Sequence, residues 1–184
     1  ADRMLVSTPD LLEIVPEATL SPQVVEISKF ESLRNNIKTN KVLTIAHAPT
    51  RRNTKGTDAI IAAVKNLQTQ GFSVVLDLIE DSSPEEVIKR FSKCDVGIDQ
   101  LLSGWYGKAG VELMAMGKPV LCYIDSRFKK VKADLPIINV TKRTLEENLI
   151  QLINNREQIS KIGEESVQFA INNHNVDTMV EDIL

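Results

Sequence analysis

The sequence predicts an α/β fold, a doubly wound parallel sheet followed by extra helices at its C-terminal end. From residue 41 onward, short runs rich in β-branched residues alternate with segments whose apolar residues recur at helical spacing. The 184 residues suffice for one well-packed domain with an appended piece. Strands that alternate with helices pair in parallel through right-handed crossovers, and ligands bind beyond their carboxyl ends.

Each predicted strand is a short apolar run, and each predicted helix has a recognisable beginning or end. Gly71 ends the first helix, and Ser83 caps the second with Pro84 at its first position. Thr144 opens the helical tail, with Glu147 placed as in a capping box. Strands are expected at 42–46, 74–79, 96–98, 119–124 and 137–138, and helices at 57–70, at 84–92, from Gly107 and from Thr144.

The first thirty residues follow a different pattern. Residues 4–7 predict a strand, and Pro9, Pro16 and Pro22 then interrupt the segment that leads to residues 24–27. We therefore expect residues 1–30 to belong partly to another domain and residues 31–184 to form the domain itself.

Composition and charge exclude several classes of partner. The formal net charge is −3, so we expect neither nucleic acid nor an anionic membrane as a bulk partner. The two cysteines, Cys94 and Cys122, provide neither a disulfide framework nor metal-ligand spacing. The sequence has no apolar run long enough to span a membrane and no signal peptide, so we expect a reduced, cytoplasmic protein.

The segment 103–120 combines a glycine loop, a short helix with one acid and a new strand. Gly104 and Gly107 allow close approach of a ligand, and the helix that begins near Gly107 presents unpaired N–H groups. A phosphate suits such a site and would compensate Lys108, a cation in the first turn. Glu112 lies one turn further and could take a ribose hydroxyl pair. A surface loop with a Lys108–Glu112 ion pair of about 0.3 kcal/mol explains the same residues.

A basic cluster is predicted at the same edge of the sheet. Arg51, Arg52 and Lys55 follow the strand at 42–46. Arginine offers a planar fork to phosphate oxygens and lysine a point charge. Because the carboxyl ends of parallel strands share one edge, this cluster and the glycine loop can converge on one anionic ligand. A solvated loop explains the cluster alone equally well.

These residues resemble a known family, the nucleotide-sugar glycosyltransferases of the GT-B architecture. The run from Val111 to Val120 is similar to the family's leucine-Glu-Ala-Met-Ala-x-Gly-x-Pro-Val, and Lys55-Gly56 is similar to its phosphate-binding Arg…Lys-Gly element. The resemblance covers residues 42–184 and implies the Rossmann-like, C-terminal, donor-binding domain of the retaining group 1 type. Residues 1–30 then correspond to the end of the N-terminal acceptor domain and the crossover.

The resemblance also implies roles for individual residues. Arg52 (or Arg51) and Lys55 would be the catalytic cations that stabilise the leaving diphosphate. Backbone N–H groups at Gly107 would hold the same group, and Glu112 would bind the ribose. The remaining residues expected at the donor site are His47, Gly104, Tyr106 and Lys108.

The function implied is that of the donor-binding half of a hexosyltransferase in polysaccharide biosynthesis. The donor would be a nucleotide-diphosphate sugar, and neither a metal nor another cofactor is expected. The acceptor, a glycan or lipid, would bind a preceding domain. The isolated chain is therefore expected to be inactive, and the full-length protein to associate peripherally with a membrane.

One departure from the family keeps a second function open. The acid that contacts the transferred sugar in the family stands eight residues before the ribose-binding Glu, and Gly104 occupies that position here. A non-catalytic, nucleotide-binding module is therefore the alternative. A phospho-receiver domain is disfavoured because the first strand of the alternating region leads into cations, and a dehydrogenase because the glycines precede the third helix. The residues expected to be solvated are Asp77, Glu80, Asp81 and His174.

Overall fold

The computed structural model describes residues 4–34, 41–128, 130–131 and 134–177. At its centre is a five-stranded sheet in the order β4-β3-β5-β6-β7, in which every pairing is parallel. The strands are β3 (Leu43–His47), β4 (Val74–Leu78), β5 (Val96–Ile98), β6 (Val120–Cys122) and β7 (Ile137–Asn139). The predicted doubly wound parallel sheet is confirmed.

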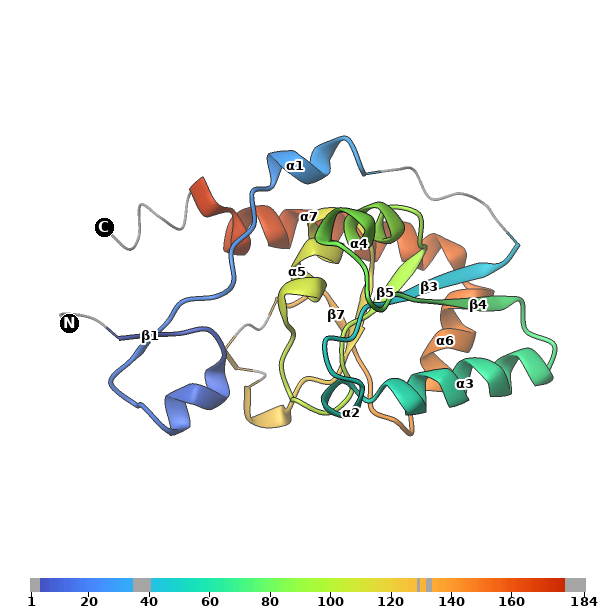
Figure 1. Cartoon of the computed structure of the whole chain (residues 1–184), viewed down its shortest axis with the longest axis horizontal. Coiled ribbons are helices and arrows are strands. Elements are labelled where there is room, and N and C mark those ends of the chain that lie inside the picture. The colour runs from blue at the N-terminus through green and yellow to red at the C-terminus, as the bar shows by residue number, and fades with distance from the viewer. Residues whose placement is uncertain (1–3, 35–40, 129, 132–133, 178–184) are drawn as a thin grey trace.

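Helices cover both faces of this sheet (Figure 1). One face carries α4 (Pro84–Phe91), α5 (Lys108–Ala115) and α7 (Arg156–His174), and the other carries α3 (Thr57–Thr69) and α6 (Leu145–Asn154). Each layer has its own core: Phe91, Met114 and Phe169 are buried on the first face, and Ile60 and Leu149 on the second. Because both faces are covered, β5 and β6 are buried along their whole length.

The predicted helix ends at Gly71, Ser83 and Thr144 are confirmed, but the capping box predicted at Thr144 is wrong. The Ser83 hydroxyl accepts a hydrogen bond from the Glu86 amide at 3.3 Å, and Gly71 follows α3 with a φ of +87°. Thr144, in contrast, makes no side-chain cap of α6. Its hydroxyl accepts from the Thr141 amide at 2.9 Å instead, so the capping box does not form.

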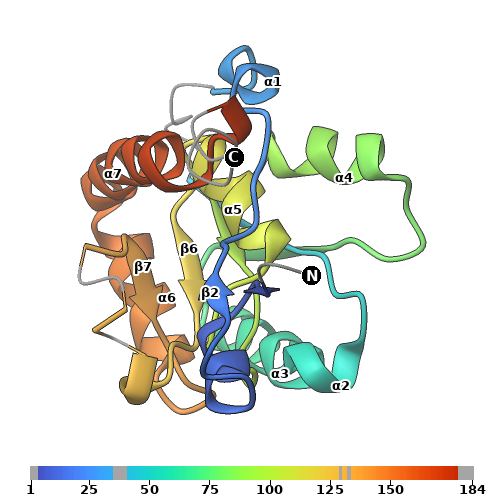
Figure 2. The ribbon, with the colours of Figure 1, turned by 90° about the vertical axis from the view of Figure 1, so that its left-hand side faces the viewer.

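The first described residues form a small unit of their own. β1 (Leu5–Val6) pairs in parallel with β2 (Thr19–Leu20), and the short helix η1 (Pro9–Glu13) lies between them. This unit lies beyond the carboxyl ends of the central strands (Figure 1), and in the turned view it faces the reader (Figure 2). Arg127, which lies in the short helix η2 (Ser126–Phe128) after β6, reaches it through an ion pair of 2.9 Å with Glu13.

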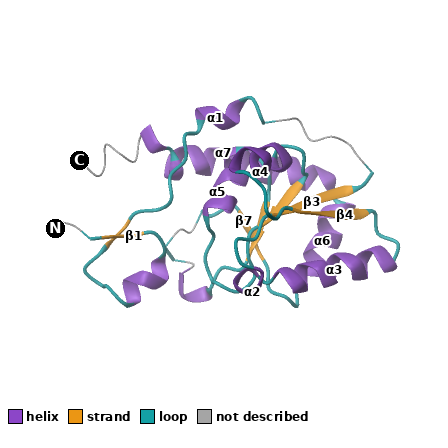
Figure 3. Ribbon diagram, in the orientation of Figure 1, coloured by secondary structure: helices purple, strands orange, loops and turns teal. Residues whose placement is uncertain are grey.

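The segment between β2 and α1, residues 21–27, forms the crossover from this unit, and it is fixed to the end of α7. The Val25 amide donates to the His174 carbonyl at 2.8 Å, and the Val176 amide donates to the Val25 carbonyl at 3.1 Å. The crossover continues into α1 (Ser28–Glu31), whose Phe30 is buried in the same core as α5. The sequence did not predict α1, which is a single turn (Figure 3). The division at residue 30 stays a prediction, and residues 178–184 of the predicted domain lie outside the described residues.

Two absences apply to the described part of the chain. No helix there is both long enough and apolar enough for a bilayer crossing. No three side chains among its His, Cys, Asp and Glu residues gather so that they could hold a metal ion. Cys94 and Cys122 are buried free thiols.

Candidate functional site

The basic cluster and the glycine loop lie side by side at the carboxyl edge of the sheet. The Leu101 amide donates to the Lys55 carbonyl at 3.1 Å, and the Ser103 hydroxyl donates to the Thr54 carbonyl at 3.5 Å. The basic segment is a one-turn helix, α2 (Arg52–Lys55), where the sequence predicted a loop. The two features therefore lie together at this edge, as expected, and Lys55 is the member of the cluster nearest the glycine loop. Their convergence on one ligand stays a prediction.

A buried carboxylate connects Lys55 with the glycine loop. Asp99 follows β5 directly, and its side chain is 0% exposed. Its Oδ1 accepts from Lys55 Nζ at 2.6 Å and its Oδ2 accepts from the Gly107 amide at 2.5 Å. The Lys55 ammonium is thereby held at the first turn of α5, where helix N–H groups and the positive end of the helix dipole also lie.

Arg52 is engaged on the side of β4. Its Nε donates to Glu80 Oε1 at 2.7 Å and its Nη2 to Glu80 Oε2 at 2.5 Å. This pairing lowers the pKa of Glu80 below its ordinary value. Glu80 is therefore a partner of the basic cluster and not simply a solvated loop acid. Asp77, also expected to be solvated, is paired with Arg90. Arg51, the other arginine of the basic cluster, is exposed.

His47 lies inside the fold. Its Nδ1 is 2.8 Å from the Ile98 carbonyl and its Nε2 is 2.9 Å from the Thr57 hydroxyl. Because a carbonyl can only accept, Nδ1 carries the proton and Nε2 accepts from Thr57. Burial lowers the pKa of His47, which favours this neutral form. Both ring nitrogens are thus used to join β3, β5 and α3, and in this conformation neither is available to a ligand.

The glycine loop is shaped by packing as well as by glycine. Gly104 has a φ of +77°, and a Cβ there would lie 3.1 Å from Asp125 Cβ. Trp105 and Tyr106 are buried, with ring centroids 5.0 Å apart. The Tyr106 hydroxyl is 3.1 Å from His174 Nε2, and His174 is fully buried, so the expectation that it is solvated is wrong. Tyr106 therefore anchors the loop inside the domain.

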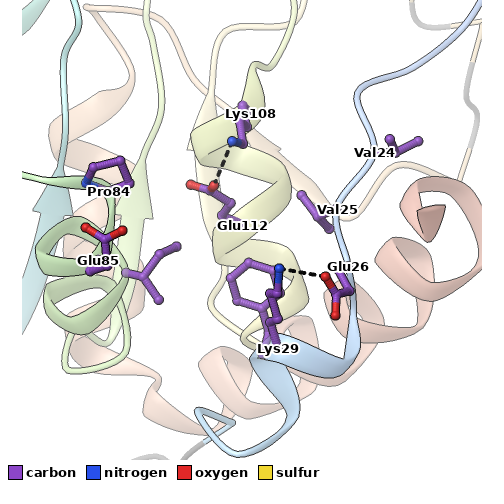
Figure 4. Close-up of a pocket in the computed structure, with 10 residues that line it drawn as sticks. Val24, Val25, Glu26, Lys29, Pro84, Glu85, Lys108 and Glu112 are labelled. Carbon is purple, nitrogen blue, oxygen red and sulfur yellow. Dashed lines mark ion pairs between the residues drawn. The ribbon is translucent and has the colours of Figure 1, made fainter.

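Glu112 faces a pocket of about 530 Å³ between the crossover, α4 and α5. Its side chain is 16% exposed and lies 3.6 Å from Lys108 Nζ. Burial raises the pKa of Glu112, and Lys108 opposes that rise. Figure 4 shows Glu112 and Lys108 between Pro84 and Glu85 on one side and Val24 and Val25 on the other. The further lining residues are Glu26, Lys29, Phe30 and Ile88.

Four of the predicted residues thus lie along α5. Lys55 and Gly107 meet at its start, and Lys108 and Glu112 line the pocket beside it. The N–H of Gly107, which was expected to hold the diphosphate, is donated to Asp99 instead. Sequence reasoning missed Asp99, although its place directly after the strand at 96–98 was a usable signal. It also missed the pocket wall formed by residues 24–30, because only tertiary packing brings that segment beside α5.

No protein-family model matches the sequence, and no curated protein matches it either. Solved structures do match it, at low sequence identity. TarM of S. aureus, crystallised with fondaparinux, alpha-GlcNAc-glycerol and UDP, is 15% identical, with a TM-score of 0.71 over 97% of this chain and 42% of its own. HepE of Anabaena, crystallised with UDP-glucose, is 14% identical, with a TM-score of 0.73 over 100% of this chain and 62% of its own.

A third match is a domain of similar size. The C-terminal domain of LpcC from Francisella tularensis, a glycosyl transferase group 1 family protein, is 14% identical, with a TM-score of 0.58 over 83% of this chain and 99% of its own. The chain thus spans 42% of TarM and 62% of HepE. These likenesses show the fold, and at that level they confirm the predicted GT-B, Rossmann-like C-terminal domain.

Proposed function

We propose that this chain is the nucleotide-binding half of a glycosyltransferase whose donor is a nucleotide-diphosphate sugar. The observation that carries the proposal is the placement of Lys55 at the start of α5 and of the Glu112 pocket one turn later. Gly107 and Glu112 are five residues apart, about 7.5 Å along a helix axis. One nucleotide can therefore place its diphosphate at the first end and its ribose at the second.

At the first end, the chemistry needed is stabilisation of a leaving diphosphate. Negative charge develops on that group as the bond to the sugar breaks, and fixed cations and N–H dipoles stabilise it. Lys55 keeps donors beyond the one given to Asp99, because an ammonium has three. Arg52 lies in the same one-turn helix and can exchange Glu80 for a phosphate oxygen. These cations would act without a required metal, so we expect diphosphate binding to persist in a chelator.

At the second end, the pocket suits a nucleoside. Its volume of about 530 Å³ falls within the range of about 300–1,000 Å³ that small-molecule sites occupy. Val24, Phe30 and Ile88 give it apolar walls for a base. The Glu112 carboxylate can accept hydrogen bonds from both ribose hydroxyls.

The stereochemistry, the transferred group and the acceptor are proposed for the whole protein and not for this chain alone. We propose retention of configuration at the sugar and a hexosyl group as the part transferred. The glycan or lipid acceptor would bind a preceding domain, with residues 1–30 as its end. Transfer would then require that domain, and this chain alone would bind the donor only. A cytoplasmic location and peripheral membrane association of the full-length protein stay predictions.

Calorimetric titration of the chain with UDP, GDP and ADP tests the proposal. We expect one of them to bind, with affinity lowered about tenfold or more in Lys55→Ala and in Glu112→Ala. Lys65→Ala and Glu164→Ala remove the same side-chain types from exposed positions on α3 and α7 and should change nothing. Absence of binding by all three nucleotides to the folded chain would refute the proposal.

Gly104 favours a second candidate, a nucleotide-binding module without transferase activity. The resemblance implies an acid at this position, and here a glycine with a φ of +77° occupies it. Residues with a side chain rarely adopt that conformation, whereas glycine adopts it readily. Release of sugar from a nucleotide-sugar donor by the full-length protein would eliminate this candidate, whereas nucleotide binding without any turnover would favour it.

A further inference from the structure

Asp99 is the most completely enclosed charged group at the edge described above. It follows β5, and both of its carboxylate oxygens have partners from different segments, the Lys55 ammonium at 2.6 Å and the Gly107 amide at 2.5 Å. The Asp99 side chain is 0% exposed, whereas that of Lys55 is 14% exposed. The carboxylate therefore lies behind the ammonium, and a ligand must approach Lys55 from the solvent side.

The first turn of α5 packs directly on this carboxylate. A Cβ at position 110 would lie 3.2 Å from Asp99 Oδ2 and 3.4 Å from Tyr106 Cβ. A Cβ at position 107 would lie 3.5 Å from Lys55 Nζ and 3.6 Å from Asp99 Oδ2. The two glycines thus leave the space that lets Asp99, Lys55 and the helix start lie against one another.

We propose that Asp99 is a positioning residue for the anion end of the site. Its buried carboxylate fixes the Lys55 ammonium and, through the Gly107 amide, the start of α5. The remaining donors of Lys55 and the free N–H groups of the first turn of α5 then face one diphosphate. The inference rests on the proposed function, whose diphosphate end it explains.

The physical reason is the order that the carboxylate imposes on its two partners. Lysine has a flexible four-carbon stem, and its ammonium loses rotational freedom when it binds a phosphate. A charge-assisted hydrogen bond to Asp99 restricts the ammonium before the ligand arrives, so less freedom is lost on binding. The same carboxylate also fixes the residue at which α5 begins, so the N–H groups of the first turn keep a constant direction.

A competing role for Asp99 would give the opposite result. If the carboxylate occupied the position of a ligand phosphate, its removal would free Lys55 and strengthen anion binding. The two roles therefore predict opposite changes in anion affinity when the Asp99 carboxylate is removed.

Calorimetric titration of the full chain with pyrophosphate and with UDP measures this change in affinity. In Asp99→Asn, the amide has one acceptor oxygen for two donors, so we expect affinity for both probes to fall about tenfold. Affinity for uridine, which has no phosphate, should be unchanged. Asp77→Asn removes another carboxylate of the sheet that pairs with a cation, Arg90, and should leave all three affinities unchanged.

Gly110→Ala provides a second variant if Asp99→Asn does not fold. It keeps every charge and favours the helix, but its methyl group displaces the Asp99 carboxylate, so pyrophosphate and UDP should again bind more weakly. Unchanged or tighter pyrophosphate binding in a folded Asp99→Asn protein would overturn the inference while wild-type UDP binding upholds the proposed function. Failure of the wild type to bind either probe would refute both.

Discussion

The Tyr106 hydroxyl and His174 Nε2 lie 3.1 Å apart, which joins the glycine loop to the last residue of α7. His174 Nδ1 lies 2.7 Å from the Gln23 carbonyl. Because that carbonyl can only accept, Nδ1 carries the proton and Nε2 accepts from Tyr106. One buried histidine thus connects the crossover, α7 and the loop that precedes α5.

Replacement of His174 should loosen this junction. In His174→Ala, the buried Tyr106 hydroxyl and the partly buried Gln23 carbonyl both lose a partner. We expect the free energy of unfolding to fall by about 1–3 kcal/mol, as measured by urea denaturation. Asn172→Ala removes an exposed polar side chain from the same helix and should have little effect. An equally small change in both variants would contradict the role assigned to His174.

The Arg52–Glu80 pair should limit how strongly Arg52 binds phosphate. Glu80→Gln removes the negative charge that holds the guanidinium, so we expect UDP to bind more tightly in this variant. Since solvent reaches both side chains, the stability of the fold should change little. Calorimetric titration measures the affinity, and Glu86→Gln, which breaks an exposed pair with Lys89, is the matched control. Weaker UDP binding in Glu80→Gln would contradict a phosphate role for Arg52.

Glu112 should lower the stability of the fold while it serves ligand binding. Burial raises its pKa above the ordinary 4.5, so the ionised form is disfavoured in the folded protein. The stability of the wild type is therefore higher below the unfolded pKa and declines as the pH rises through the folded pKa. We expect Glu112→Gln to be more stable than the wild type near neutral pH and equal to it in acid, as measured by thermal unfolding.

The same variant should bind nucleotide more weakly at neutral pH, because an amide offers the ribose one acceptor oxygen in place of two. Wild-type affinity should fall as the pH is lowered through the raised pKa of Glu112, and the affinity of Glu112→Gln should not follow that decline. Equal nucleotide affinity of the two proteins at neutral pH would exclude Glu112 from the ribose site.

Gly104 should resist replacement for two separable reasons. Its φ of +77° strains any side chain, and a Cβ would lie 3.1 Å from Asp125 Cβ. We expect Gly104→Ala to lower the free energy of unfolding by about 1–2 kcal/mol. Gly71→Ala is the control for backbone strain alone, since Gly71 has a φ of +87° and nothing within 4 Å of its Cβ position. An equal loss in both variants would show that Asp125 contributes nothing.

Local pattern predicted the sheet well, because its strands are short apolar runs and two of the inner ones, β5 and β6, are buried on both faces. The strand at 96–98 has the predicted bounds, and the one at 74–79 ends one residue early. The one-turn helix α2 was missed because four polar residues carry no periodicity. The partners of Arg52, Tyr106 and Asp99 could not be predicted either, since each contact joins segments that only the tertiary fold brings together.

The most direct test of the central claim is a map of backbone amide chemical shifts during titration of the chain with UDP or GDP. Nucleotide binding along α5 predicts shifts at both ends, around Lys55 and Gly107 and around Phe30 and Glu112, which saturate with one dissociation constant. Shifts confined to one end, or two ends that saturate independently, would contradict binding of a single nucleotide across the site.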